Sequence, residues 1–228
     1  MTAPVQTLRF ADSGEAADLA AFLGRLIHYD RAAAVRLQGG GAAVAVFGRP
    51  PSFDVLAIRT VRLGEPAELD VTVSAGELLE GIGEGRQFAV PAPVTGPPWA
   101  GVLPPRGGWR QLDGLPGTAQ MRAAVAAAVA EFRSRDEALP EAHRTRAERD
   151  RIGNEIWSRT LGTTDLPLRA VHAAQSVGFL RPTADEAPAA LFGAGSWLRL
   201  RTPFGSTAVR LAGTGGLGSL PGLSVTPA

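Results

Sequence analysis

Residues 118–161, TAQMRAAVAAAVAEFRSRDEALPEAHRTRAERDRIGNEIWSRTL, carry the clearest secondary-structure pattern of the chain. The recurrence of apolar residues at i, i+3, i+4 and i+7 predicts a helix capped by Thr118 that ends near Glu137, before Pro140. Its apolar stripe consists of Met121, Ala124, Val125, Ala128, Val129 and Phe132, and its other side consists of Ala123, Ala126, Ala127 and Ala130. Because alanine has little bulk, we expect a second element to approach that side closely. A charge-rich helix with Pro140 in its first turn follows, which predicts a helical hairpin.

The chain before this hairpin predicts a strand-rich lobe over residues 1–90. A strand at residues 5–10 and a helix from Gly14 to His28 precede two apolar segments on either side of a glycine turn, a pattern typical of a β-hairpin. Segment 53–63, FDVLAIRTVRL, has no fully polar face, so we expect a central strand. The segment ELDVTVSAGELLEGI then predicts a strand and a helix. The resulting order β-α-β-β-β-β-α resembles one half of a processivity-clamp domain, and this resemblance implies a fold and no function.

Residues 91–117 predict a Pro/Gly-rich strap between two lobes. The segment VPAPVTGPPWAGVLPPRGGW, residues 90–109, holds six prolines and four glycines, so no regular element fits it. Trp99 and Trp109 are costly to leave in water, since burying such a side chain is worth roughly 1.5 to 3 kcal/mol. The interpretations that stay open are a strap packed across both lobes, a docking loop whose tryptophans insert into a partner, or a polyproline-like ligand.

Residues 118–211 predict a helical lobe with a β-hairpin, and residues 212–228 a flexible tail. We expect Asp165 to cap a helix that has Pro167 in its first turn and ends near Val177. The alternating segment SWLRLRTPFGSTAVRL predicts a hairpin with an apolar face and a second face that carries Trp197, Arg199, Arg201 and Arg210. A helix followed by such a hairpin is the order of a winged helix, whose recognition helix would present Arg169, His172 and Gln175.

These elements predict an α/β protein of the α+β type. An antiparallel sheet with packed helices forms its N-terminal lobe, and a helical hairpin with a winged-helix-like helix and β-hairpin forms its C-terminal lobe. The segments DLPLRAVHAAQSVGFL and SWLRLRTPFGS resemble an uncharacterised two-domain protein family of high-GC actinobacteria. This resemblance spans most of the chain and implies no activity.

The composition excludes several kinds of chemistry. All 23 basic residues are arginine and cysteine is absent, which removes lysine Schiff bases, the P-loop lysine, thiol nucleophiles and cysteine-ligated metals. The three histidines form no H-x-x-x-H pair, so we predict no metal site, no cofactor and no catalytic residue. A net charge of +1 gives no strong field toward DNA or membranes. Without an apolar run of spanning length or a signal-peptide pattern, we expect a cytoplasmic protein.

We therefore expect a non-enzymatic interaction or regulatory module with an unknown protein partner. Its candidate interaction residues are Trp99, Trp109, Trp197, Arg199, Arg201 and Arg210. One alternative is a winged-helix-like regulator that binds DNA through Arg169, His172, Gln175, Arg199 and Arg201. A second alternative is an enzyme with a site of Ser, Asp, His or Arg side chains between the lobes.

Overall fold

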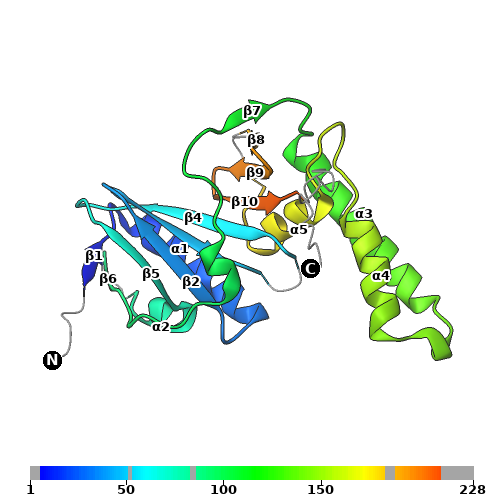
Figure 1. The fold of residues 1–228 in the computed structure, drawn as a ribbon, viewed down its shortest axis with the longest axis horizontal. Helices are drawn as coiled ribbons and strands as arrows, with labels where there is room; N and C mark the ends of the chain where they lie inside the picture. Colours follow the sequence, from blue (N-terminus) through cyan, green and yellow to red (C-terminus); the bar gives the residue numbers. More distant parts are fainter. Residues whose placement is uncertain (1–5, 51–52, 83–85, 183–187, 212–228) are drawn as a thin grey trace, which may run out of the picture.

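The computed structural model describes residues 6–50, 53–82, 86–182 and 188–211 (Figure 1). The predicted tail, residues 212–228, lies outside the described residues. The first half contains β1 (Thr7–Arg9), α1 (Ser13–Tyr29), β2 (Ala34–Gly39), β3 (Ala43–Gly48), β4 (Leu56–Arg62), β5 (Leu69–Ser74), α2 (Ala75–Glu80) and β6 (Gln87–Ala89). The second half contains the 3-10 turn η1 (Pro98–Gly101), β7 (Arg110–Leu112), α3 (Thr118–Glu137), the 3-10 turn η2 (Glu141–His143), α4 (Arg146–Trp157), α5 (Leu168–Ser176), β8 (Ala190–Ala194), β9 (Trp197–Thr202) and β10 (Gly205–Arg210).

One eight-stranded antiparallel sheet runs through both halves of the chain, in the order β5-β2-β3-β4-β10-β9-β8-β7. Strand β4 pairs with β3 on one side and with β10 on the other, where Ala57 lies opposite Thr207. The predicted α+β class with antiparallel strands is confirmed, and segment 53–63 supplies a central strand as predicted. The predicted C-terminal hairpin is confirmed as β9 and β10, but β10 also pairs with β4, so the hairpin is part of the sheet.

Helices cover one face of this sheet and the strap crosses the other. Helix α1 packs on β4 and helix α5 on β10, where the Thr207 hydroxyl donates to the carbonyl oxygen of Ala170 at 3.0 Å. On the opposite face, Phe47, Ile58 and Ala208 form a small apolar cluster that the strap covers with Trp99 and Leu103. Neighbouring residues of one strand therefore serve different layers of the protein.

The strap is anchored at three places along its length. The N–H of Val94 donates to the carbonyl oxygen of Thr72 at 2.9 Å, and the Arg36 guanidinium donates to the carbonyl oxygen of Ala100. Its last part, β7, pairs with β8 at the far edge of the sheet. Trp99 and Trp109 are half-buried in this arrangement. The contacts are those of a packed strap.

Three helix starts differ from the prediction. The N-cap of α3 is Gly117, one residue before Thr118. Pro140 precedes η2, and α4 begins only at Arg146, because the Thr145 hydroxyl accepts the N–H of Glu148 at 3.2 Å and caps the helix there. Pro167, not Asp165, is the N-cap of α5, because Leu161 pairs with Leu166 through a backbone hydrogen bond of 2.9 Å and so keeps the preceding residues out of the helix.

The alanine side of α3 is exposed, so the expectation of a close second element there is wrong. Both α4 and α5 pack on α3, which buries Met121, Val125 and Ala128, while Ala123 and Ala127 face solvent. High helix propensity alone accounts for these exposed alanines.

Ion pairs join α3 to α4 across their solvent-facing sides. Arg135 donates to Glu155 at 2.8 Å, and Arg159 donates to Glu131 at 2.6 Å. The hydrogen bond from Arg135 lowers the pKa of Glu155 from 4.5 to about 2. The charged form of Glu155 is therefore the one that the folded helical hairpin favours.

A second tie joins α1, β4 and the turn between β9 and β10 through Arg59. Its guanidinium donates to Asp18 at 2.9 Å and to the carbonyl oxygen of Phe204 at 2.7 Å, and it lies 3.5 Å from the Glu15 carboxylate. The side chains of Arg59 and Glu15 are each only 10% exposed. This tie connects the two halves of the chain next to the pairing of β4 with β10.

We predict that Glu155→Gln lowers stability at neutral pH and has no effect at low pH. Since the folded-state pKa lies below the unfolded value, the stabilisation is present above pH 4.5 and is lost as the pH falls to about 2. The thermal midpoints of the wild type and the variant should be measured from neutral pH down to about pH 2, and they should become equal at the lowest pH. Glu137→Gln, at an exposed position without an ion pair among the described residues, is the control. A gap that stays constant with pH would contradict the prediction.

We predict that Arg59→Ala lowers the free energy of unfolding by about 3 kcal/mol, because removing one partner of a buried pair leaves a carboxylate poorly compensated. Urea titration measures this change, and Arg133→Ala, at an exposed position of α3, serves as the control with a change near zero. Equal stability of the two variants would show that the tie does not stabilise the fold.

Candidate functional site

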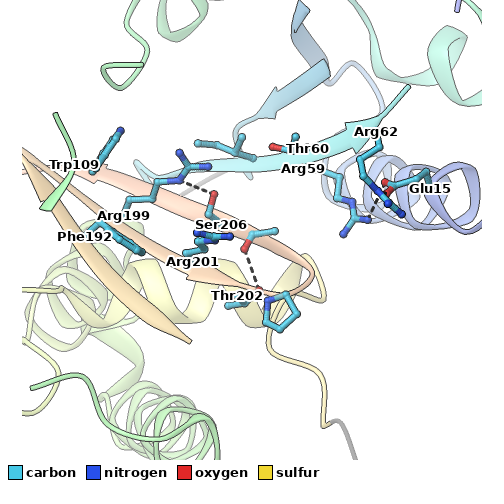
Figure 2. A pocket seen from close by; sticks show the side chains of 13 residues that line it. Glu15, Arg59, Thr60, Arg62, Trp109, Phe192, Arg199, Arg201, Thr202 and Ser206 are labelled. Carbon is cyan, nitrogen blue, oxygen red and sulfur yellow. Dashed lines mark hydrogen bonds and ion pairs between the residues drawn. The ribbon is translucent and has the colours of Figure 1, made fainter. Parts of the chain in front are cut away.

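A hollow of about 480 Å³ lies where β4 extends past the turn between β9 and β10 (Figure 2). We call it the junction groove. Its wall from the first half includes Glu15, Arg59, Thr60 and Arg62, and its wall from the second half includes Trp109, Phe192, Arg199, Arg201 and Ser206. Both halves of the chain are thus needed to form it.

The two arginines on the first-half wall of the groove, Arg59 and Arg62, are already paired with carboxylates. Arg62 donates to Glu15 at 2.7 Å and to Asp12 at 3.0 Å, while Arg59 contacts Glu15 and Asp18. Glu15 is held in place by the N-cap of α1, where the Asp12 carboxylate accepts its N–H at 3.0 Å. This wall therefore carries positive and negative charge in balance.

The two arginines on the second-half wall of the groove have no carboxylate partner among the described residues. Arg199 and Arg201 stand two residues apart on β9 and so lie on the same face of the sheet. Neither forms an ion pair with any residue that the structure describes. Burial lowers the pKa of Arg199, and the nearby charge of Arg201 lowers it further. Among the residues that the structure describes, no carboxylate neutralises the half-buried charge of Arg199 in the groove.

Ser206 and Trp109 fix the position of Arg199. The Arg199 Nε–H donates to the Ser206 hydroxyl oxygen at 2.9 Å, and the guanidinium carbon lies 5.8 Å from the centre of the Trp109 ring. Ser206 lies directly opposite Arg201 in the sheet. Since its oxygen accepts from Arg199, its own hydroxyl proton can be donated to a ligand.

The polar residues of α5 do not join this site. Thr207 points to α5 and its neighbour Ser206 to the groove, so the helix lies on the opposite face of the sheet. His172 is stacked on Trp157 with ring centres 4.3 Å apart, and burial lowers its pKa. Arg169 and Gln175 likewise lie on α5, so the structure does not bring the predicted recognition-helix residues together with Arg199 and Arg201.

The six predicted interaction residues share the strap-bearing face but form two groups. Trp109, Arg199 and Arg201 line the junction groove. Trp99, Trp197 and Arg210 line a smaller hollow of about 140 Å³ at the other end of β10. The strap separates the two groups, because it packs on Ala208, which lies between Ser206 and Arg210.

Four residues that line the groove were not predicted from the sequence: Glu15, Arg59, Arg62 and Ser206. Arg59 did carry a signal, because it shares one face of a buried strand with Ala57 and Val61, where an arginine needs an acidic partner. Ser206 carried none, since its role comes from pairing with Arg201 and Arg199 across the hairpin.

In the part of the chain that the structure describes, no three His, Asp or Glu side chains gather as they would around a metal ion. Within the same ranges, no helix combines the length and apolar character needed to cross a bilayer.

Comparisons with known proteins place the boundary of two domains inside the strap. Residues 3–101 match a family described as a domain of unknown function (DUF8010), and residues 104–214 match a second domain of unknown function (DUF8185). No curated protein matches the chain. The crystal structure of a DNA polymerase sliding clamp from Pseudomonas aeruginosa is similar with a TM-score of 0.48 and 12% sequence identity, over 94% of this chain and 64% of that chain. This protein thus consists of two adjacent domains of unknown function, DUF8010 and DUF8185, and the junction groove lies where they meet.

Proposed function

We propose that this protein is a non-enzymatic interaction module that binds an acidic segment of a partner protein in the junction groove. The observation that supports this proposal is the contrast between two pairs of arginines. Arg59 and Arg62 are neutralised by carboxylates, while Arg199 and Arg201 have no ion pair among the described residues. A partly desolvated charge is costly until a counter-charge pairs with it, and an acidic ligand supplies that counter-charge.

The remaining groups of the groove favour binding over catalysis. Among the described residues that line the groove, Glu15 supplies the carboxylate, and it accepts hydrogen bonds from Arg59 and Arg62. Ser206 has Arg199 as its neighbour, and an arginine does not act as a general base because it stays protonated. A hydroxyl without a base is a weak nucleophile.

The charge around the groove favours a short acidic segment over DNA. Asp12, Glu15 and Asp18 lie along the wall that α1 provides and balance the charges of Arg59 and Arg62, so this wall adds no net positive charge that would attract a long phosphate backbone. A DNA reader that used α5 together with the hairpin would also have to contact both faces of one sheet. A short peptide needs only the strap-bearing face, where Trp109 adds an aromatic contact.

We predict that a fluorescein-labelled, glutamate-rich peptide binds the full chain and that Arg199→Ala and Arg201→Ala each weaken the binding about tenfold, a loss of about 1.4 kcal/mol. Fluorescence anisotropy measures the dissociation constants, and affinity should fall as salt is added. Arg133→Ala removes the same charge far from the groove and should bind as the wild type does.

A labelled DNA duplex is titrated in parallel. Tighter binding of the duplex with a steep salt dependence would replace the proposal with the DNA-binding alternative. Equal affinity of the Arg199, Arg201 and Arg133 variants for the peptide would remove the junction groove as the binding site.

A further inference from the structure

Arg199 and Arg201 offer an anion two guanidinium groups from one strand. Side chains two residues apart on a strand leave the backbone about 6.7 Å from each other and project to the same side. Each guanidinium can donate two parallel hydrogen bonds to an anion. A carboxylate has two oxygens and satisfies one such fork, while a phosphate monoester has three terminal oxygens and can accept from both forks at once.

The charge of the pair also matches a phosphate better than a carboxylate. The pKa of Arg199 is lowered by burial and by the charge of Arg201, so the two groups destabilise one another when the groove is free. One carboxylate neutralises one of the two charges. A phosphate monoester carries about −1.5 to −2 at neutral pH and neutralises both.

Ser206 provides a third donor between the two arginines. It lies opposite Arg201, is buried in the lining of the groove and accepts the Nε–H of Arg199 at 2.9 Å. This bond leaves the terminal nitrogens of Arg199 and the hydroxyl proton of Ser206 as further donors. Figure 2 shows these three side chains gathered on one side of the hairpin, next to Trp109 and Phe192. Two forks and one hydroxyl correspond to the three terminal oxygens of a phosphate group.

The charge-balanced wall of α1 and β4 limits the ligand to a single phosphate on a larger molecule. Glu15 lines the groove on the side of α1, where it already pairs with Arg59 and Arg62, so this wall offers a second phosphate no unpaired guanidinium. A phosphorylated side chain meets this limit, because its peptide runs along the open strap-bearing face and only the phosphate enters. A polyphosphate chain does not meet it.

From this arrangement we infer that the junction groove binds a phosphorylated side chain of the partner protein, so that phosphorylation strengthens the interaction. The inference rests on the proposed function and adds its regulation: the groove discriminates a phosphate monoester from a carboxylate through Arg199, Arg201 and Ser206.

The test compares labelled peptides that differ at one central position, which is phosphoserine, glutamate or serine, within the same acidic sequence. The full chain should bind the phosphoserine peptide at least about tenfold more tightly than the glutamate peptide, as measured by fluorescence anisotropy. Arg199→Lys keeps the charge but loses the two parallel donors of the guanidinium. It should therefore lower the affinity for the phosphoserine peptide more than the affinity for the glutamate peptide. Ser206→Ala should lower the affinity for the phosphoserine peptide several-fold. Arg133→Ala should leave the affinities for the phosphoserine and glutamate peptides unchanged.

The pH dependence gives an independent readout. The second ionisation of a phosphate monoester has a pKa of about 6, so the preference for phosphoserine should shrink as the pH is lowered through that value. The affinity of the glutamate peptide should hold until its own carboxylates protonate, at a pH of about 4.3.

The outcomes separate this inference from the proposed function. Equal affinity for phosphoserine and glutamate would overturn the inference and leave the interaction module standing. Failure of all three peptides to bind would overturn both. Competition by inorganic phosphate or a mononucleotide at the affinity of the phosphopeptide would assign the groove to a small molecule and overturn the partner protein as its source.

Discussion

The pairing of β4 with β10 is the contact on which the rest of the structure depends. It joins two domains that are separate in sequence into one sheet, and the hydrophobic core continues beneath it from α1 to α5. Without this pairing each domain would expose a sheet edge whose N–H and C=O groups need a partner. Arg59 reinforces the seam, because it contacts α1 on one side and the turn at Phe204 on the other.

The same seam creates the junction groove. Strand β10 ends its pairing with β4 at Ile58, while β4 continues to Arg62, so a step remains beside the hairpin turn. The step places the neutralised arginines of one domain next to Arg199 and Arg201 of the other. The proposed anion-binding residues Arg199, Arg201 and Ser206 all come from the second domain, while the first domain supplies the opposite wall. A ligand there would stabilise the folded chain by an amount that rises with the logarithm of its concentration divided by its dissociation constant.

Much of the secondary structure was predictable because it depends on local patterns. Alternation in β4 and the apolar stripe of α3 reflect the periods of a strand and a helix, and the turn between β2 and β3 is marked by its glycines. The helix starts at Arg146 and Leu168 were not predicted, because a threonine cap and a backbone hydrogen bond near Leu161 competed with the proline signals. Among the residues that line the groove, Arg199 and Arg201 were candidates because they share one face of the predicted hairpin, and Trp109 because a tryptophan in the strap is costly to expose. Glu15 and Ser206 were not candidates.

The sequence by itself determined the α+β class, the helices and strands with a clear period, and the absence of thiol and lysine chemistry, because each of these depends on residue types and short-range spacing. The short elements β6, η1, β7 and β8 were not predicted, and η1 and β7 lie in the strap, where no regular element was expected. Only the tertiary structure decided that β4 pairs with β10, that α5 and the hairpin arginines lie on opposite faces of one sheet, and which arginines are neutralised. These features join residues that are distant in the sequence, 44 positions apart for Glu15 and Arg59 and 145 for Arg59 and Phe204. No local pattern encodes which distant strand or carboxylate completes a hydrogen bond.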